Sequence, residues 1–420
     1  MSFSSLSRSP TLRPSEGVMD GRHSWLVLIA AIVVYTHALG MGTAYGIYFI
    51  EFMTEFDVSM SAAALVASIM YGATTATAPI SSLLYRRLGS QKTIMLGGLV
   101  ASFGFFTCSF ASSLRQVAFI HGIIGFGFGI TTIPIWSVHT EYFDRYRNLA
   151  LGILTAGGGL GLFIFSPIFT YLINEYTWRG SMLLNAAITL HVVGAGFLIK
   201  PLQKTTCKVL LVKDDVSCEK RFPSEKIFLF AMSALCWAGS GQTFYQMMPT
   251  LAKHHDISES MMIVITSAIG ATDIFARLSA AVLNHTLLRR HTVFLYAMAL
   301  FMVAMTQLAV SMCASFESFL FAGVCFGCSF GLTLGSYGAS AFDVFGFEHF
   351  PEVIGIATFA CSIGGLTIPV LAGYLGDTYG IVWTFLFAAL VAVTGSIGCF
   401  ALAIRKHLGQ SKQLIRSAAA

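Results

Sequence analysis

The sequence predicts an all-α membrane protein with twelve transmembrane helices arranged in two halves of six. Apolar residues make up 55% of the 420 residues and charged residues only 11%, and the mean hydropathy is +0.74. A water-soluble fold could not bury so much apolar surface. Twelve apolar stretches follow one another along the chain, and each is long enough to cross about 30 Å of hydrocarbon at about 1.5 Å per residue. A polar loop divides the twelve into six and six.

The domain boundaries follow from these stretches. A tail rich in Ser, Arg and Pro, residues 1–22, precedes the first half, 23–199. A polar central loop, 200–226, separates it from the second half, 227–405, and residues 406–420 form a second tail. The predicted spans are, in order, 23–50, 58–85, 93–114, 116–140, 148–174, 180–199, 227–252, 261–288, 291–316, 318–342, 353–376 and 378–404.

The positive charges predict the orientation. If the amino terminus is cytoplasmic, 21 of the 25 Lys and Arg residues fall in cytoplasmic segments and only three fall in loops on the other side. Such an excess over short loops is the usual mark of the cytoplasmic side. We therefore expect both tails in the cytoplasm. We interpret the net charge of +5 as a topology signal and expect no binding of nucleic acid.

The eighth span, 261–288, is the only one of the twelve that carries Asp, Glu, Lys or Arg. Its Asp273 and Arg277 lie four residues apart, which places both on one face of a helix. A charge at bilayer depth costs roughly 2.5–3.5 kcal/mol on insertion scales, so membrane helices keep one where it has a partner or faces a polar cavity. The pair is therefore a candidate functional site. A purely structural ion pair between helices is the alternative.

Related turns in the two halves indicate an internal repeat. The turn Leu84-Tyr-Arg-Arg-Leu-Gly-Ser-Gln-Lys92 in the first half corresponds to Leu287-Leu-Arg-Arg-His291 in the second. Two related six-helix halves around a central loop are typical of transporters whose site lies between the halves. The first turn, together with Trp178-Arg-Gly180, resembles motifs of the major facilitator superfamily. That resemblance implies the superfamily's fold.

Three further motifs resemble the monocarboxylate transporter family, solute carrier family 16, within that superfamily. Asp20-Gly-Arg-His-Ser-Trp25 is similar to the family's opening motif, from which Arg22, His23 and Ser24 depart. Tyr142-Phe-Asp-Arg-Tyr-Arg-Asn-Leu-Ala-Leu-Gly152, followed by Ala156-Gly157, is similar to its fifth-span signature. Asp273-Ile-Phe-Ala-Arg277 matches its eighth-span Asp-x-x-x-Arg pattern.

The resemblance implies roles for individual residues. In the family the eighth-span Arg is taken to bind the substrate carboxylate and the Asp to take part in coupling, and here these are Arg277 and Asp273. The chemistry fits, because a guanidinium offers a two-pronged fork to a carboxylate and a buried carboxyl group can exchange a proton. Arg147 resembles a family position at the cytoplasmic mouth of the pathway, with a plain positive-inside anchor as the alternative. The resemblance also implies a symporter of the plasma membrane and a single-span glycoprotein chaperone as a partner.

The first span departs from the family pattern. Proton-coupled relatives carry a lysine where this chain has Thr43, and residues 23–50 contain no lysine. We place Thr43 in the substrate site and expect weak proton coupling, because a hydroxyl carries no charge near neutral pH. His37 is a candidate coupling residue since imidazole titrates near neutrality, with helix packing as the alternative. Tyr337 of the tenth span is a candidate wall of the substrate pocket, and helix packing is again the alternative.

The remaining patterns narrow the function. The Gly-rich runs 122–129 and 157–161 lie inside predicted spans, where small residues let helices approach closely, so we do not interpret them as nucleotide-binding loops. We expect no cofactor and no metal, and a carrier rather than an enzyme. The function we predict is transport of small organic anions, monocarboxylates in particular, across a lipid bilayer by alternating access. The alternatives are a facilitative carrier of amino-acid-like, thyroid-hormone-like or cationic solutes and a non-transporting receptor or scaffold.

Overall fold

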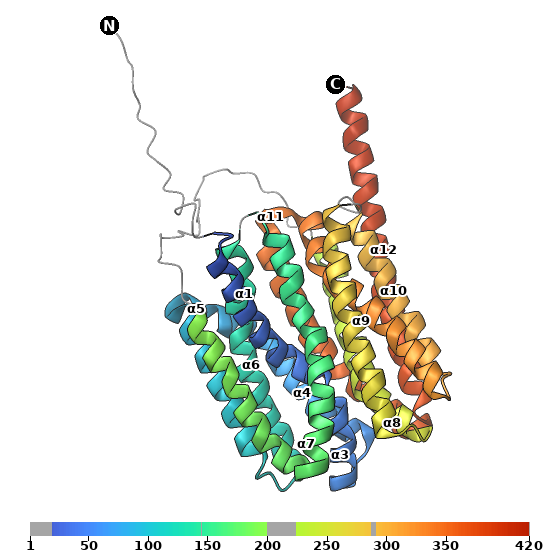
Figure 1. Cartoon of the computed structure of the whole chain (residues 1–420). Coiled ribbons are helices and arrows are strands. Elements are labelled where there is room, and N and C mark those ends of the chain that lie inside the picture. Colours follow the sequence, from blue (N-terminus) through green and yellow to red (C-terminus); the bar gives the residue numbers. More distant parts are fainter. Residues whose placement is uncertain (1–18, 144, 200–223, 287–290, 420) are drawn as a thin grey trace.

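The computed structural model describes residues 19–143, 145–199, 224–286 and 291–419, and every regular element in these ranges is a helix. The helices run roughly along one long axis (Figure 1). The start of α1 (Arg22–Tyr35) and the C-terminal end of α12 (Val382–Ala419) lie on the same side of the bundle, which we call the terminal side. The opposite side is called the far side below.

The first predicted span is not one continuous α-helix. After α1 the chain forms a π-helical segment, η1 (Thr36–Gly40), a single turn, α2 (Met41–Thr43), and then α3 (Gly46–Phe56). Gly40 explains part of this interruption, because a Cβ added there would lie only 2.4 Å from the Cα of Gly161. The absence of side chains lets the two backbones touch, as the Gly-rich composition of 157–161 predicts.

The other helices of the N-terminal half are α4 (Met60–Ala76), α5 (Ala78–Cys108), α6 (Leu114–Tyr142) and α7 (Arg147–Leu198). Two of them, α5 and α7, are long and turn back on themselves. Within α5 the chain reverses at Gly89, whose φ of 79° is readily adopted only by glycine. Within α7 it reverses at Thr177, with a φ of 60°.

The C-terminal half repeats this plan. It consists of α8 (Ser224–His254), α9 (Glu259–His285), α10 (Thr292–Val310), α11 (Phe316–Tyr379) and α12. The reversal within α11 is at Gly346, where φ is 70°. Compared with the predicted boundaries, α8 begins within the central loop and α12 continues through residues predicted as a tail. Residues 1–18 and 200–223 of the predicted tail and central loop lie outside the described residues.

The predicted twelve crossings are confirmed once these reversals are considered. Nine helices of the described part are long and apolar enough to cross a bilayer, or ten with the bent pair of α4 and α5. That number takes residues 149–198 as one segment, although Thr177 divides it into two crossings. Gly89 likewise divides residues 60–108 into two crossings. Divided at both turns, the described chain crosses twelve times.

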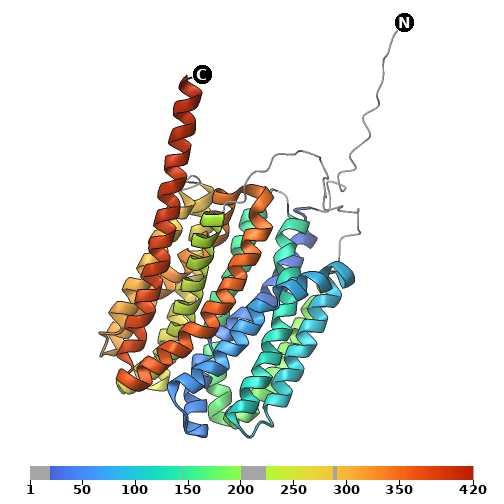
Figure 2. The same cartoon turned by 180° about the vertical axis from the view of Figure 1, so that it is seen from behind.

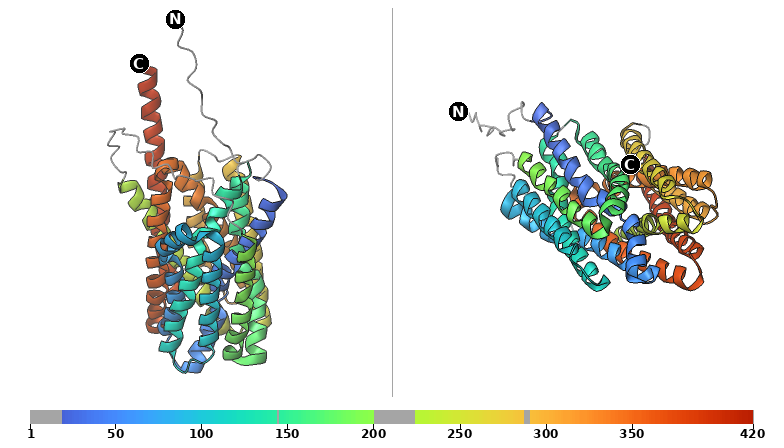
Figure 3. Two further views of the ribbon diagram at one scale, coloured as in Figure 1. Left: turned by 90° about the vertical axis from the view of Figure 1, so that its left-hand side faces the viewer. Right: turned by 60° about the horizontal axis from the view of Figure 1, so that its bottom comes forward.

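The two halves lie side by side, as the tilted view on the right of Figure 3 and the rear view in Figure 2 show. The most extensive contacts between them are made by three helix pairs: α7 with α9, α4 with α11, and α3 with α8. The first crossing of α7 runs next to α9, so polar groups on that face of α9 meet α7 of the other half.

Candidate functional site

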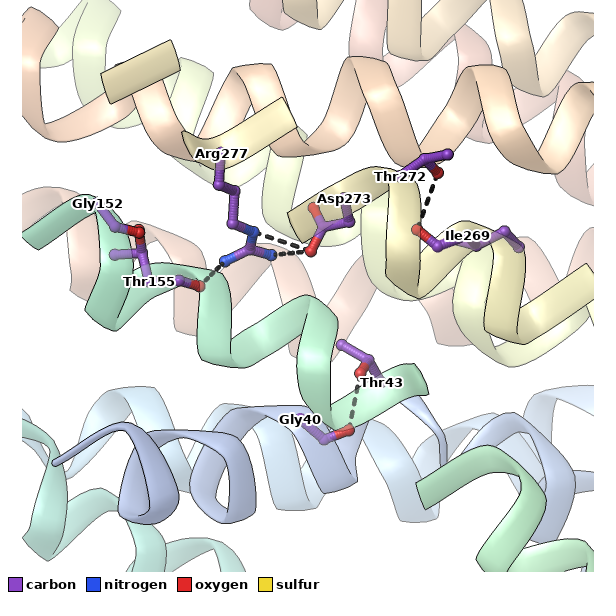
Figure 4. A network of polar contacts seen from close by, with 8 residues as sticks. All are labelled: Gly40, Thr43, Gly152, Thr155, Ile269, Thr272, Asp273 and Arg277. Atoms are coloured by element: carbon purple, nitrogen blue, oxygen red, sulfur yellow. Dashed lines mark hydrogen bonds and ion pairs between the residues drawn. The ribbon is translucent and has the colours of Figure 1, made fainter. Parts of the chain in front are cut away.

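The candidate site is the ion pair of α9 at the interface of the halves. Arg277 lies one helical turn after Asp273, and its Nε donates a hydrogen bond of 2.8 Å to Asp273 Oδ2. A terminal guanidinium nitrogen lies 2.8 Å from the same oxygen. The two side chains are only 3% and 1% exposed, so both charges are removed from solvent. The predicted pair is therefore formed, and it is buried (Figure 4).

The N-terminal half completes the site through the backbone of α7. The second terminal nitrogen of Arg277, Nη1, donates to the carbonyl oxygen of Thr155 over 2.7 Å. This hydrogen bond crosses from one half to the other, and Figure 4 shows it beside the contact with Asp273. Charge-assisted bonds of this kind are about twice as strong as neutral ones. Arg277 thus ties α9 to α7 as well as to its own helix.

Three glycines make room for the pair. A Cβ at Gly158 would lie 2.9 Å from a terminal nitrogen of Arg277, and one at Gly159 would lie 2.5 Å from Asp273 Oδ2. On the opposite side a Cβ at Gly331 of α11 would lie 3.0 Å from Asp273 Oδ1. Any larger residue at Gly159 would displace the carboxylate, because real Cβ atoms do not approach so closely. The pair is therefore enclosed between α7 and α11.

The surroundings of the pair are aromatic as well as small. The phenol groups of Tyr35 and Tyr245 lie close enough to interact electrostatically with Arg277. Asp273 Oδ1 has no hydrogen-bond partner among the described residues. A buried carboxylate oxygen without a donor is costly, so this oxygen is the natural place for a proton or for a donor supplied by a ligand.

The guanidinium keeps capacity for an anion. It has five N–H donors, and one on each of its three nitrogens points to Asp273 or Thr155. The other N–H of each terminal nitrogen is used by neither Asp273 nor Thr155, and the Tyr35 phenol lies within hydrogen-bonding reach of the guanidinium. Two parallel N–H groups suit the two oxygens of a carboxylate. A carboxylate that takes the place of the Tyr35 phenol can therefore bind there while Asp273 keeps its position.

Thr43 comes from the facing N-terminal half and lies below the pair in Figure 4. Its hydroxyl donates to the carbonyl oxygen of Gly40 over 2.7 Å, which uses its hydrogen for local structure. Thr43 lines a cavity of about 10 Å³, near the minimum that admits one water molecule. Five helices of both halves, α2, α3, α7, α8 and α9, enclose this cavity. Its lining consists of Thr43, Ala44, Gly46, Ile47, Leu162, Ser166, Phe244, Tyr245, Met248, Pro249, Thr266 and Ile269. Tyr245 belongs both to this lining and to the surroundings of Arg277.

The other predicted residues lie apart from the pair. His37 is in η1, where Nδ1 lies 2.7 Å from the Val33 carbonyl oxygen and the ring packs 5.2 Å from that of Phe165. Tyr337 stacks on Phe230 with 5.2 Å between ring centroids, inside the C-terminal half. Arg147 is the first residue of α7, and its side chain is outside the described part.

Sequence reasoning missed several parts of the site. The Thr155 carbonyl is a backbone group and leaves no trace in the sequence. The Gly157–Gly159 run was visible, but only as a sign of close helix packing. Gly331 is separated from Asp273 by more than one helix, and no local pattern connects the two. Gly158, Gly159 and Gly331 are recognised as parts of the site only when the helices that face α9 are known.

The comparison with known families decides the classification of this fold. The family model described as Major Facilitator Superfamily matches residues 29–206 and 227–419, which are most of both halves. The chain belongs to the major facilitator superfamily. This member of the superfamily is therefore a multi-pass membrane transporter.

Its relatives within the superfamily are named monocarboxylate transporters. The chain is 34% identical to monocarboxylate transporter 13 of Rattus norvegicus over 187 residues, which are 44% of each protein. It is 27% identical to monocarboxylate transporter 6 of Mus musculus, over 94% of this chain and 90% of the relative. It is 28% identical to monocarboxylate transporter 3 of Rattus norvegicus, over 87% and 76%. The resemblance predicted from the three motifs is confirmed.

Proposed function

We propose that this superfamily member carries small organic anions, monocarboxylates in particular, across the membrane by alternating access. Arg277 binds the substrate carboxylate, and Asp273 is its resting partner. The observation that carries the proposal is a buried arginine at the interface of the halves, with an N–H on each terminal nitrogen that neither Asp273 nor Thr155 uses. The names of the relatives, all monocarboxylate transporters, support the same substrate class.

The contact with Thr155 suggests how binding couples to movement. Arg277 is attached to α9, and its bond to the Thr155 carbonyl holds α7 of the other half. A carboxylate bound through the remaining N–H of each terminal nitrogen shares Nη1 with that carbonyl and draws the guanidinium toward itself. Binding then weakens one contact between the halves at the site itself. A ligand shifts a conformational equilibrium only through such a difference in contacts between states.

The membrane and the coupling are also part of the proposal. Both termini are cytoplasmic, the carrier works in the plasma membrane, and a single-span glycoprotein assists it there. Thr43 and Tyr337 contribute to the wall of the pathway, Arg147 to its cytoplasmic mouth, and His37 and Asp273 are the candidate proton carriers. Because Thr43 replaces the lysine of proton-coupled relatives, transport is facilitative or only weakly proton-coupled.

A second candidate function follows from the same residue. Without a first-span ammonium, the site has one positive charge and one negative charge, Arg277 and Asp273. A zwitterion such as an amino acid matches that pair, with its carboxylate at the arginine and its ammonium at the unpartnered Asp273 Oδ1. Amino-acid-like, thyroid-hormone-like or cationic solutes are therefore the alternative substrates.

Uptake into proteoliposomes tests these functions together. Purified protein is reconstituted and supplied with labelled lactate, pyruvate, aromatic amino acids and creatine, with and without a pH gradient. We expect saturable uptake of a monocarboxylate that the Arg277→Lys variant loses. Uptake of a zwitterion or cation alone would favour the second candidate. Absence of uptake of every solute by correctly folded protein would indicate a receptor or scaffold.

A further inference from the structure

A second internal repeat lies at the far side of the bundle. The segment Asp57-Val-Ser-Met-Ser61 leads into α4, and the segment Asp256-Ile-Ser-Glu-Ser260 leads into α9. The aspartates share an unusual left-handed backbone, with φ of 47° and 55°. The hydroxyl groups of the two serines lie 2.9 Å apart in the first segment and 3.1 Å apart in the second. The segments are therefore structural counterparts in the two halves.

The helices that face these segments repeat as well. The first crossing of α7 ends with Tyr171-Leu-Ile-Asn-Glu-Tyr176, and α11 ends with Tyr374-Leu-Gly-Asp-Thr-Tyr379. Asn174 and Asp377 hold equivalent positions in these two sequences. Asp377 of the C-terminal half faces the start of α4, and Asn174 of the N-terminal half faces the start of α9. At the far side, each half therefore contacts the other through a residue at the same position of the repeat, Asp377 in one case and Asn174 in the other.

The two contacts differ in kind. Asp377 accepts backbone hydrogen bonds from Met60, 2.8 Å to Oδ1, and from Ser61, 3.0 Å to Oδ2. The next amide of α4, that of Ala62, donates to Ser59 Oγ over 3.3 Å. The first-turn amides of a helix have no acceptor within the helix, and its positive end attracts an anion. A carboxylate from the other half therefore satisfies two of these three amides of α4.

Asn174 makes a weaker contact. Its amide nitrogen donates to the carboxylate of Glu259 over 3.2 Å, so it binds a side chain and not the backbone. Both partners are exposed, as Asp377 is, but here the long flexible side chain of Glu259 must also be held in place. Exposed contacts of this type contribute little. On the Asp377 side the backbones also approach closely, since a Cβ at Gly373 would lie 2.9 Å from Ser61 Cα.

We propose that the Asp377 carboxylate, seated on the start of α4, is the principal latch that holds the two halves closed at the far side. The equivalent Asn174–Glu259 contact is a minor one. Opening of the far side separates α4 from α11, which leaves two backbone amides without their acceptor. The latch therefore sets the population of the state that is open to the far side. This inference depends on alternating access but not on Arg277 or on the identity of the substrate.

Thiol labelling from the far side tests the latch. Ile47 lines the small cavity between the halves and is partly buried, so Ile47→Cys reports on opening. Ser112→Cys, in the exposed far-side loop between α5 and α6, is always accessible and shows which side the reagent reaches. A membrane-impermeant maleimide is applied to cells, or to inside-out vesicles if Ser112→Cys reacts only there.

We expect Asp377→Ala to raise the labelling rate of Ile47→Cys about fivefold, the factor that corresponds to the usual cost of removing a helix N-cap. Asn174→Ala, the matched control, should change it less than about twofold, as is usual for an exposed polar contact. Asp377→Asn keeps one acceptor oxygen and should lie between. If Asp377→Ala does not reach the surface, the labelling rates of Asp377→Asn and Asn174→Ala are compared instead, and the rate should be higher in Asp377→Asn.

The latch proposal would be overturned if Ile47→Cys were labelled at the same rate in the Asp377 variants and in the parent, while Ser112→Cys labelling is also the same in both. A rise in Asn174→Ala as large as in Asp377→Ala would overturn its predominance. Failure here is distinguishable from failure of the proposed function. Arg277→Lys should lose uptake with the far-side contacts intact, whereas Asp377→Ala should change labelling whatever the substrate is.

Discussion

The two helices that meet at the site contribute opposite things. From the C-terminal half, α9 supplies both charges, Asp273 and Arg277. From the N-terminal half, α7 supplies a backbone carbonyl and two glycines, Gly158 and Gly159, that make room for them. The two charges alone do not define the site. Its geometry also requires glycines on α7, which have no side chain and so leave room for the charged groups. Substitutions on α9 or on α7 should therefore reduce uptake.

The charged side should be the more sensitive one, and Arg277→Lys tests it most severely. Lysine keeps the positive charge but loses the fork that holds a carboxylate through two bonds. Loss of one charge-assisted hydrogen bond costs about 1.5–3 kcal/mol, which predicts a reduction of uptake of about 10- to 100-fold. Uptake by proteoliposomes measures the effect, and surface labelling of cells should show near-normal expression. Uptake close to that of the parent would place the substrate elsewhere.

Asp273→Asn should have the next largest effect. The amide is nearly the same size but leaves the buried Arg277 charge without its counter-charge. Removal of one partner of a buried ion pair typically costs about 3–5 kcal/mol, part of which relaxation would recover here because the Thr155 carbonyl remains. We expect reduced uptake together with a lower thermal unfolding temperature, measured on purified protein. Unchanged stability would mean that Asp273 is neutral in the resting protein.

The glycine side of the comparison is tested by Gly159→Ala. The added Cβ would lie 2.5 Å from Asp273 Oδ2 and 2.8 Å from the Gly270 carbonyl oxygen, so either the pair or the helices must move. A displacement of about 1 Å at a binding site can cost about 100-fold in activity, and partial relaxation should make the loss here about tenfold. Uptake kinetics of the substrate measure it.

Gly194→Ala is the matched control in the same helix, since a Cβ there meets nothing within 4 Å. Alanine has the higher helix propensity, so this variant should keep full uptake and equal or greater stability. A similar loss of uptake in both variants would show that α7 tolerates no alanine for general reasons, and the Gly159 result would then say nothing about the ion pair.

The smallest effect is expected from pH. Because Thr43 carries no charge, an inward acid gradient should raise initial uptake less than about twofold once substrate ionisation is controlled, and Thr43→Lys should increase the dependence. Concentrative uptake driven by the proton gradient alone in the parent would contradict this expectation. It would identify Asp273 or His37 as the working proton carrier.

One group outside the spans could add its own pH dependence. Glu141, beyond the apolar span Leu114–Val138, accepts a hydrogen bond from Tyr85, and burial raises its pKa to about 7. The Glu141 carboxylate is protonated as the pH falls through about 7. Acidic pH therefore favours conformations in which this side chain is buried and uncharged. Any pH effect that disappears in Glu141→Gln belongs to this group and not to the ion pair.

The sequence predicts one side of the interface much better than the other. Charges inside apolar spans are rare, so Asp273 and Arg277 stand out without a structure. The interruption of the first span could not be predicted, because residues 23–50 contain no charged residue or proline to mark a break. The π-helical segment ends at Gly40, which touches Gly161, a residue far away in the sequence. A π-helical turn also shifts the helical phase of every later residue. The directions of His37 and Thr43 therefore could not be read from a regular periodicity.

The latch illustrates the same limit. The related sequences around Asn174 and Asp377 are visible in the chain, but an amide and a carboxylate look like a conservative exchange. Only the structure shows that one caps a helix backbone and the other contacts a side chain.

The most direct test of the central claim exchanges the two charges, with Asp273→Arg and Arg277→Asp in one protein. The exchange keeps the ion pair on the same helix face and so separates a structural role from a binding role. If Arg277 must reach a substrate carboxylate, surface expression should recover relative to either single charge reversal while uptake of the labelled monocarboxylate stays at the level of empty liposomes. Uptake restored to near that of the parent would contradict the account and leave the pair as a structural lock.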